Sequence, residues 1–322
     1  MSGDVLTSFT VYGVIAAPAF QQCTDAAAYV NRTYPESYAV SIQRDVPRDF
    51  DERRAQWIAA GQLATDEHAR SDVLVHNVAT NAFMTAAEFL ALVMLTTHYR
   101  ADPSTDNAES YRARAQQSWL DFLAARDRQY CWMDVTVDDV AVGRVWFELF
   151  SAVAPLTCKN FCELCRGTSV EVTLPSASTS AAAEAGSADQ AAGTRTLLTY
   201  KGTTFFRILK DAWVMAGDVT AGHSGNGGYS CYGRTFPDES FAVAHDAAGV
   251  LGMCNDGPHT NSSSFYITRR PLSWMDRKYV AFGRVMDGMS VVDAIHAVGV
   301  KHNQSPLATI VIADCGVLDP SE

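Results

Sequence analysis

The pattern of apolar runs changes near residue 130, and this change constrains the fold more than any other feature. Before it, runs rich in β-branched and aromatic residues alternate with longer helical patterns. After it, Pro and Gly punctuate short apolar runs, as in a β-rich domain with many turns. A chain of 322 residues is also too long for one ordinary core. The sequence therefore predicts two domains of different class.

The N-terminal part, residues 1–105, has the element order of an α/β layer fold. Pro18 suits the first turn of a helix, where no backbone N–H is needed, and Thr85 with Glu88 has the spacing of a capping box. A linker helix within residues 106–130 has one apolar face, which we expect to dock on this domain. The expected strands are 8–15, 38–42 and 73–78, and the expected helices begin at residues 18, 49 and 85.

The same element order, with a proline at the head of the first helix, resembles a thioredoxin or glutaredoxin domain over residues 8–97. In that family a Cys-Pro-x-Cys pair stands where this chain has Ala17-Pro18-Ala19-Phe20. Because a thiolate is the nucleophile of dithiol exchange, we expect a degenerate domain that has lost this chemistry. We interpret Cys23, one helical turn further on, as a packing residue rather than a redox group.

The charge pattern argues against two classes of partner. Up to residue 130 there are 11 basic and 16 acidic residues, and after it 14 basic and 20 acidic, so the net charge of −11 divides into −5 and −6. Neither part has the basic character of a protein that binds nucleic acid or an anionic membrane. The N-terminus lacks a secretory pattern, and no run of 18 apolar residues occurs. We expect a soluble, intracellular protein.

Residues 131–322 form the expected β-rich domain. Asp138-Asp139 separates two alternating runs and indicates a hairpin, whereas residues 168–196, rich in Ser, Ala, Thr and Gly, indicate a flexible insertion. The predicted helix 155–166 carries three cysteines at i, i+4 and i+7, which favours a buried face over a zinc site. No metal or cofactor is expected. Other strands are expected at 132–138, 143–150, 243–253, 264–268, 280–285 and 308–314, and a short helix at 290–298.

The stretch 200–218 contains an arginine that needs an explanation. Arg207 follows the apolar run 204–206, which predicts hydrophobic surroundings, and a second apolar run follows at 213–215. Burying an unpaired guanidinium is costly, so such a residue is either paired structurally or directed at a ligand. Position and composition alone favour the structural pairing.

Seven segments resemble cyclophilin motifs, in the family order, across residues 131–318. The resemblance implies a closed eight-stranded antiparallel barrel capped by two helices, which binds X-Pro peptides on its outer face and isomerises them. The segment 278–283, Trp213 in the active strand and a comparable N-terminal region give a closer resemblance to the long ciliary group of that family called peptidyl-prolyl isomerase-like six. The segments are 142–150, 155–167, 200–207, 249–253, 260–267, 280–285 and 310–316.

The chemistry implied by this resemblance needs neither nucleophile nor metal. Rotation about an X-Pro amide has a barrier of about 18–20 kcal/mol. In cyclophilins an arginine donates a hydrogen bond toward the prolyl nitrogen, which stabilises the twisted state. The resemblance makes Arg207 this catalytic arginine and Trp274 the rim of the proline pocket. The remaining peptide-binding positions that it implies are Ala212, Trp213, Met215, Asn255, Ser264, Tyr266, Met275 and Tyr279.

Three departures from the family pattern predict an impaired site. Ala212 replaces the phenylalanine of the pocket floor, although Trp213 beside it is able to refill part of that space. Met215 and Ser264 replace two glutamines of the polar network around the arginine, and a thioether is only a weak acceptor. Catalytic groups without such support lose rate. We expect an X-Pro peptide-binding scaffold with weak or lost isomerase activity; the alternative is an active isomerase that assists folding.

The closer group also implies an address and partners. The expected location is the cytoplasm or a cilium or flagellum, where the chain would act in the axoneme. The expected partners are X-Pro-containing protein segments and axonemal microtubule-associated proteins, with neither nucleic acid nor membrane among them.

Overall fold

The computed structural model describes residues 6–63, 66–102, 106–126, 128–172 and 194–318. The chain divides into two compact units, and the division falls between residues 127 and 128. Each unit has its own hydrophobic core. Within the described ranges, no helix is long and apolar enough to cross a membrane.

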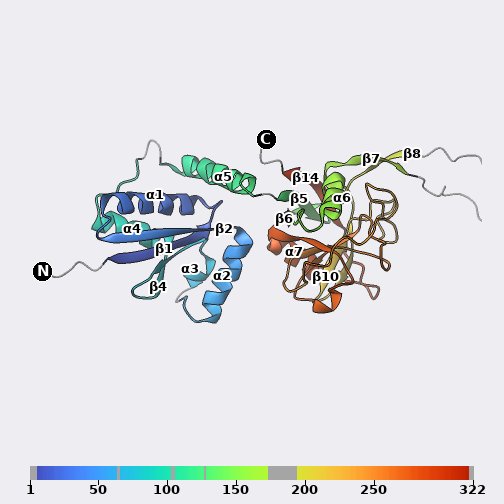
Figure 1. Cartoon of the computed structure of the whole chain (residues 1–322). Coiled ribbons are helices and arrows are strands. Elements are labelled where there is room, and N and C mark those ends of the chain that lie inside the picture. The colour runs from blue at the N-terminus through green and yellow to red at the C-terminus, as the bar shows by residue number, and fades with distance from the viewer. Residues whose placement is uncertain (1–5, 64–65, 103–105, 127, 173–193, 319–322) are drawn as a thin grey trace, which may run out of the picture. The chain divides into compact units, whose positions relative to one another are not determined.

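The first unit is an α/β layer built on a four-stranded mixed sheet of order β2-β1-β3-β4 (Figure 1). β1 and β2 are parallel and α1 connects them, while β3 runs antiparallel to β1 and β4 antiparallel to β3. The elements are β1 (Thr7–Val14), α1 (Pro18–Thr33), β2 (Tyr38–Asp45), α2 (Pro47–Ala59), α3 (Asp66–Arg70), β3 (Val73–Asn77), β4 (Ala82–Thr85), α4 (Ala86–Thr96) and α5 (Ala108–Ala124).

The alternation of β1 places its side chains on two different faces of this sheet. Phe9 and Val11 are buried in the main core of the unit, where the Phe9 ring meets the Phe89 ring of α4 at 5.7 Å. Tyr12 instead contacts Trp57 of α2, with ring centroids 5.0 Å apart. α5 packs against α1. The predicted α/β layer is therefore confirmed.

Local sequence signals predicted most elements of this unit. The helix at Pro18 and the capping box at Thr85 are confirmed, since Glu88 N–H donates to the Thr85 hydroxyl and Thr85 N–H to the Glu88 carboxylate. Cys23 is fully buried, and burial raises the pKa of its thiol to about 12, as expected for a packing residue. The sequence missed β4 and α3, which have only four and five residues. The thioredoxin resemblance stays a prediction.

The second unit is an eight-stranded antiparallel sheet of order β14-β5-β6-β13-β11-β12-β10-β9. A single antiparallel bridge between Thr204, before β9, and Val311 of β14 nearly closes it into a barrel. α6 and α7 are its two longer helices, as predicted (Figure 1). The elements are β5 (Gln129–Val137), β6 (Val140–Leu149), α6 (Pro155–Arg166), β7 (Thr168–Val172), β8 (Thr194–Leu198), β9 (Phe205–Leu209), β10 (Trp213–Ala216), β11 (Val250–Met253), β12 (Phe265–Thr268), η1 (Ser273–Met275), β13 (Ala281–Asp287), α7 (Met289–Ala297) and β14 (Ile310–Leu318).

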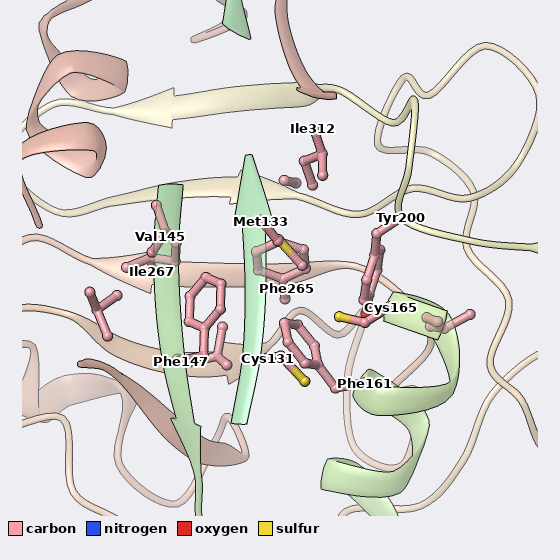
Figure 2. Close-up of a cluster of buried hydrophobic side chains, with 14 of the residues drawn as sticks. Cys131, Met133, Val145, Phe147, Phe161, Cys165, Tyr200, Phe265, Ile267 and Ile312 are labelled. Atoms are coloured by element: carbon pink, nitrogen blue, oxygen red, sulfur yellow. The ribbon is translucent and has the colours of Figure 1, made fainter. Parts of the chain in front are cut away.

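Phe161 of α6 joins this helix to the barrel core. Figure 2 shows it among side chains from several strands, and its ring centroid lies 5.2–5.7 Å from those of Phe147, Tyr200, Phe265 and Phe282. The three cysteines of α6, Cys158, Cys162 and Cys165, are buried on the same side. The predicted buried cysteine face is therefore confirmed.

Two predictions for this unit are wrong in part. Residues 243–249 are not a strand; irregular hydrogen bonds hold this segment instead, with Leu272 N–H donating to the His245 carbonyl at 2.7 Å. The ends of the proposed flexible insertion pair with each other as strands β7 and β8. Both strands contain β-branched residues, which favour extended structure. The rest of that insertion, 173–193, lies outside the described residues. The Asp138-Asp139 hairpin is confirmed, and both residues have positive φ, 47° and 65°.

Candidate functional site

Arg207, Met215 and Tyr266 form a row across three adjacent strands of the barrel sheet. Arg207 on β9 is the register partner of Met215 on β10, and Met215 is the partner of Tyr266 on β12. A register shift beside Met215 leaves Phe206 unpaired, as in a β-bulge, and bulges re-aim side chains next to functional sites. Sequence motifs about 60 residues apart are thus brought together.

Arg207 does not lie in hydrophobic surroundings, so that prediction is wrong. Its side chain is exposed, because the bulge at Phe206 interrupts the alternation of β9, so that Phe205 and Ile208 are both buried while Arg207 faces outward. Its Nε–H donates to the side-chain oxygen of Gln304 at 2.9 Å. The guanidinium therefore needs no buried counter-charge and stands at the surface of the site.

Met215 and Tyr266 of this row also belong to a small apolar cluster outside the barrel core. Its buried members are Ala212, Tyr266, Leu272 and Met275, and Trp213 and Met215 pack against them. Aromatic rings continue the cluster to the surface: Trp213 to Trp274 at 5.7 Å, Trp274 to Tyr279 at 6.4 Å and Tyr279 to Tyr266 at 5.9 Å. Trp274 is 51% exposed and forms the rim of the cluster. Trp213 and Ala212 therefore belong to the same cluster.

The hydroxyl of Tyr266 is bound inside this cluster. His245 is fully buried, with Nδ1 2.7 Å from an oxygen of Asp276 and Nε2 2.6 Å from the Tyr266 hydroxyl oxygen. Because a carboxylate only accepts, Nδ1 carries a hydrogen and donates to Asp276, while Nε2 forms the second hydrogen bond with the Tyr266 hydroxyl. Gly252 provides the space, since a Cβ there would clash with the hydroxyl.

The two remaining polar positions of the predicted site, Asn255 and Ser264, have different environments. Asn255 Nδ2–H donates to the carbonyl of Lys278 at 2.9 Å, which ties two loops together beside Trp274. These loops and Phe241 surround an open hollow of about 650 Å³ that shares Trp274 and Tyr279 with the cluster. The Ser264 hydroxyl is buried and has no partner among the described residues. Ser264 therefore supports neither Arg207 nor a neighbour.

Sequence reasoning missed three residues of this site: Gln304, His245 and Gly252. Gln304 is 97 residues from Arg207 in the chain, and no local pattern links them. Gly252 and His245 contribute to the site through the Tyr266 hydroxyl. The tyrosine in place of the family's phenylalanine was therefore the one sequence feature that pointed to them. Within the described ranges, no group of three His, Cys, Asp or Glu side chains is placed to hold a metal ion.

The arrangement presents a donor cation next to an apolar pocket, on a rigid barrel face. Such a site can hold a proline ring against the aromatic and aliphatic side chains, while the guanidinium donates to the adjacent peptide group. The Cys254 thiol packs against the cluster, but burial raises its pKa and so disfavours the nucleophilic thiolate. The hollow beside the cluster is lined by charged side chains as well as aromatic and amide ones. Noncovalent peptide recognition is therefore what its chemistry supports.

Comparison with known proteins places this barrel in context. Residues 132–317 match the family model described as cyclophilin type peptidyl-prolyl cis-trans isomerase/CLD. The chain is 39% identical over 197 residues to a mouse protein named probable inactive peptidyl-prolyl cis-trans isomerase-like 6, which covers 61% of this chain and 56% of the mouse protein. The human protein of the same name is 37% identical over 206 residues, 64% of this chain and 59% of its own length.

A third relative is similar over only a small part of its own length. The mouse NK-tumor recognition protein is 38% identical over 198 residues, which are 61% of this chain but only 12% of that protein. The similarity to the isomerase-like 6 relatives likewise spans little more than half of their length.

Proposed function

The chain belongs to the cyclophilin-type peptidyl-prolyl cis-trans isomerase family, and we propose that its barrel binds X-Pro protein segments as a scaffold, with weak or no isomerase activity. The observation that carries this proposal is the row of Arg207, Met215 and Tyr266 beside an apolar pocket. The pocket suits a proline ring, and the arginine suits the adjoining peptide group.

Met215 and Ser264 are the two positions that support the impairment. Met215 stands directly opposite Arg207, where its thioether is a poor acceptor, and the Ser264 hydroxyl is buried without a described partner. Isomerisation requires interactions that are stronger in the twisted state than in the planar one, and these need side chains held in place. Peptide binding is less demanding. The relatives named probable inactive support the same conclusion.

A coupled proline-isomerisation assay on the full chain tests this proposal, with peptide binding measured in parallel by NMR titration. We expect binding together with slow turnover, and Arg207→Ala should weaken the binding. The double variant Met215→Gln/Ser264→Gln should raise turnover, because it returns two amide groups to the site. A wild-type rate equal to that of ordinary cyclophilins, abolished by Arg207→Ala, would overturn the scaffold proposal.

The second candidate function is an active isomerase that assists folding. The specific observation in its favour is that Arg207 is retained, exposed and held by a hydrogen bond. The isomerisation assay described above decides between the two candidates, because only this one predicts a fast rate without any substitution.

We further propose a place for the chain in the axoneme of a cilium or flagellum, bound to microtubule-associated proteins, with a thioredoxin-like first unit that no longer exchanges disulfides. The parallel β1-α1-β2 arrangement with Pro18 at the helix start supports the thioredoxin likeness, and Ala17 and Phe20 at the positions of the cysteines support the loss. Fractionating cells into detergent-soluble and cytoskeletal pools tests the address. Recovery only in the soluble pool would contradict it.

A further inference from the structure

Gln304 makes two hydrogen bonds to consecutive residues of β9. Its backbone carbonyl accepts from Ile208 N–H at 2.9 Å, and its side-chain oxygen accepts from Arg207 Nε–H at 2.9 Å. The first bond fixes the strand that carries the arginine, and the second fixes the arginine itself. One residue therefore sets both the position and the direction of the guanidinium.

The backbone of Gln304 adopts a conformation that glutamine rarely takes. Its φ is +67°, in the left-handed region that glycine enters freely and residues with a Cβ enter at a cost. The turn around it is well defined, since Gln304 N–H donates to the Lys301 carbonyl and Lys301 N–H to the Ser305 carbonyl, both at 2.9 Å. A strained residue inside a rigid turn points to a role for its side chain.

The hydrogen bond at Nε leaves the two terminal amino groups of Arg207 available for a ligand. No other described residue accepts a hydrogen bond from this side chain. A guanidinium is a planar fork, so fixing Nε restricts the direction of both terminal amino groups. These groups can then donate to a bound peptide without first losing rotational freedom.

We propose that Gln304 is the positioning residue of this site, which holds Arg207 toward a bound X-Pro segment in place of the amide side chains missing at Met215 and Ser264. The proposal rests on the proposed peptide-binding function. It assigns the support of the arginine to the turn before β14 rather than to the neighbouring strands.

A purely structural role for Gln304 makes different predictions, and three variants separate the two. Gln304→Gly removes the carboxamide and relieves the positive φ, while the backbone carbonyl still serves Ile208. Gln304→Asn tolerates the left-handed conformation better than glutamine but is one methylene too short. Gln304→Ala keeps the strain and loses the side chain. Ser305→Ala, in the same turn, is the matched control.

We expect the glycine and asparagine variants to bind an Ala-Ala-Pro-Phe peptide about tenfold more weakly than wild type, with thermal midpoints equal to or above that of wild type. The alanine variant should lose the same affinity at a lower midpoint, and the serine control should change neither. Binding that stays at the wild-type level in the glycine and asparagine variants would overturn the proposal.

A double-mutant cycle shows whether Gln304 acts through the arginine. Arg207→Ala combined with Gln304→Gly should bind no more weakly than Arg207→Ala alone, whereas additive losses would contradict the assignment. The Nε–H signal of Arg207 in a ¹⁵N NMR spectrum, identified by its absence in Arg207→Lys, should move only in the Gln304 variants. If wild type binds no peptide but this signal still depends on Gln304, the proposed function fails while the hydrogen bond stands; if the signal is indifferent to Gln304, the positioning role fails.

Discussion

At the scale of single residues, the tyrosine at position 266 illustrates how one extra atom is accommodated. Its hydroxyl needs space, which Gly252 supplies, and a partner, which His245 supplies at 2.6 Å. His245 is in turn oriented by Asp276 through two bonds, one to its ring at 2.7 Å and one to its backbone N–H at 2.9 Å. Tyr266 is thus held by a connected polar network beneath the apolar cluster.

Removing the tyrosine hydroxyl should therefore be costly. We expect Tyr266→Phe to lower the free energy of unfolding by about 1–3 kcal/mol, because the buried Nε2 of His245 loses its partner. Chemical denaturation of the full chain measures this loss. Tyr279→Phe is the control, since the Tyr279 hydroxyl bonds none of the described residues, and an equal loss in both variants would contradict the explanation.

The same network predicts a dependence on pH. Hydrogen bonds from the side chain and backbone of His245 lower the pKa of the Asp276 carboxyl below its ordinary value. A lowered folded-state pKa stabilises the protein above the unfolded pKa of about 3.9, and this stabilisation is lost as the pH falls through the folded-state value. Thermal midpoints of wild type and Asp276→Asn should accordingly differ most at pH 6–7, and the difference should shrink as the pH falls below about 3.9. A difference that grows on acidification would contradict this.

These residues also show what the sequence could and could not predict at this scale. Arg207 and Tyr266 were identifiable because they lie in motifs that are continuous in the sequence, and Trp274 because it stands between two of those motifs at a position that the resemblance assigns. Gln304 and His245 were not, because their partners are contributed by segments that meet only in the folded barrel. The exposure of Arg207 was missed because a bulge in β9 sets which way it faces, and periodicity does not reveal a bulge.

At the scale of elements, α6 shows the same division between local and distant causes. Its bounds, Pro155–Arg166, agree with the sequence prediction, since proline at the start and an apolar face are local signals. Its N-terminus is capped from far away. Ala154 has no side chain for capping, and the carboxylate of Glu239 accepts from the N–H groups of Leu156 and Thr157 at 2.8 and 2.9 Å.

This distant cap should carry a measurable share of stability. Glu239→Ala should lower the free energy of unfolding by about 1–2 kcal/mol, because two N–H groups lose their acceptor and the helix dipole loses an anion. Glu239→Gln keeps an acceptor without the charge and should lose less. Glu163→Ala, on the same helix, removes only a surface ion pair with Arg166 and should change little. Equal losses in the Glu239→Ala and Glu163→Ala variants would show that Glu239 does not act as a cap.

At the scale of the whole molecule, the chain carries two cores of different origin. One is formed where α1 and α4 cover the mixed sheet, and the other fills the barrel. The two classes were predictable because hydrophobic periodicity differs between helices and short strands. The closure of the barrel was expected only from the family resemblance, since the Thr204–Val311 bridge joins residues that no local pattern connects.

Two separate cores predict that each unit can be destabilised without the other. Phe89 is fully buried in the first core and Phe161 in the second, and either Phe→Ala change should cost about 3–5 kcal/mol. In calorimetry of the full chain, Phe89→Ala should lower the unfolding temperature of one transition and leave X-Pro peptide binding unchanged, whereas Phe161→Ala should lower the other and weaken binding. If Phe89→Ala removes peptide binding while the NMR signals of Trp274 keep their folded positions, the first unit contributes to the site, because the barrel pocket would then be intact but insufficient.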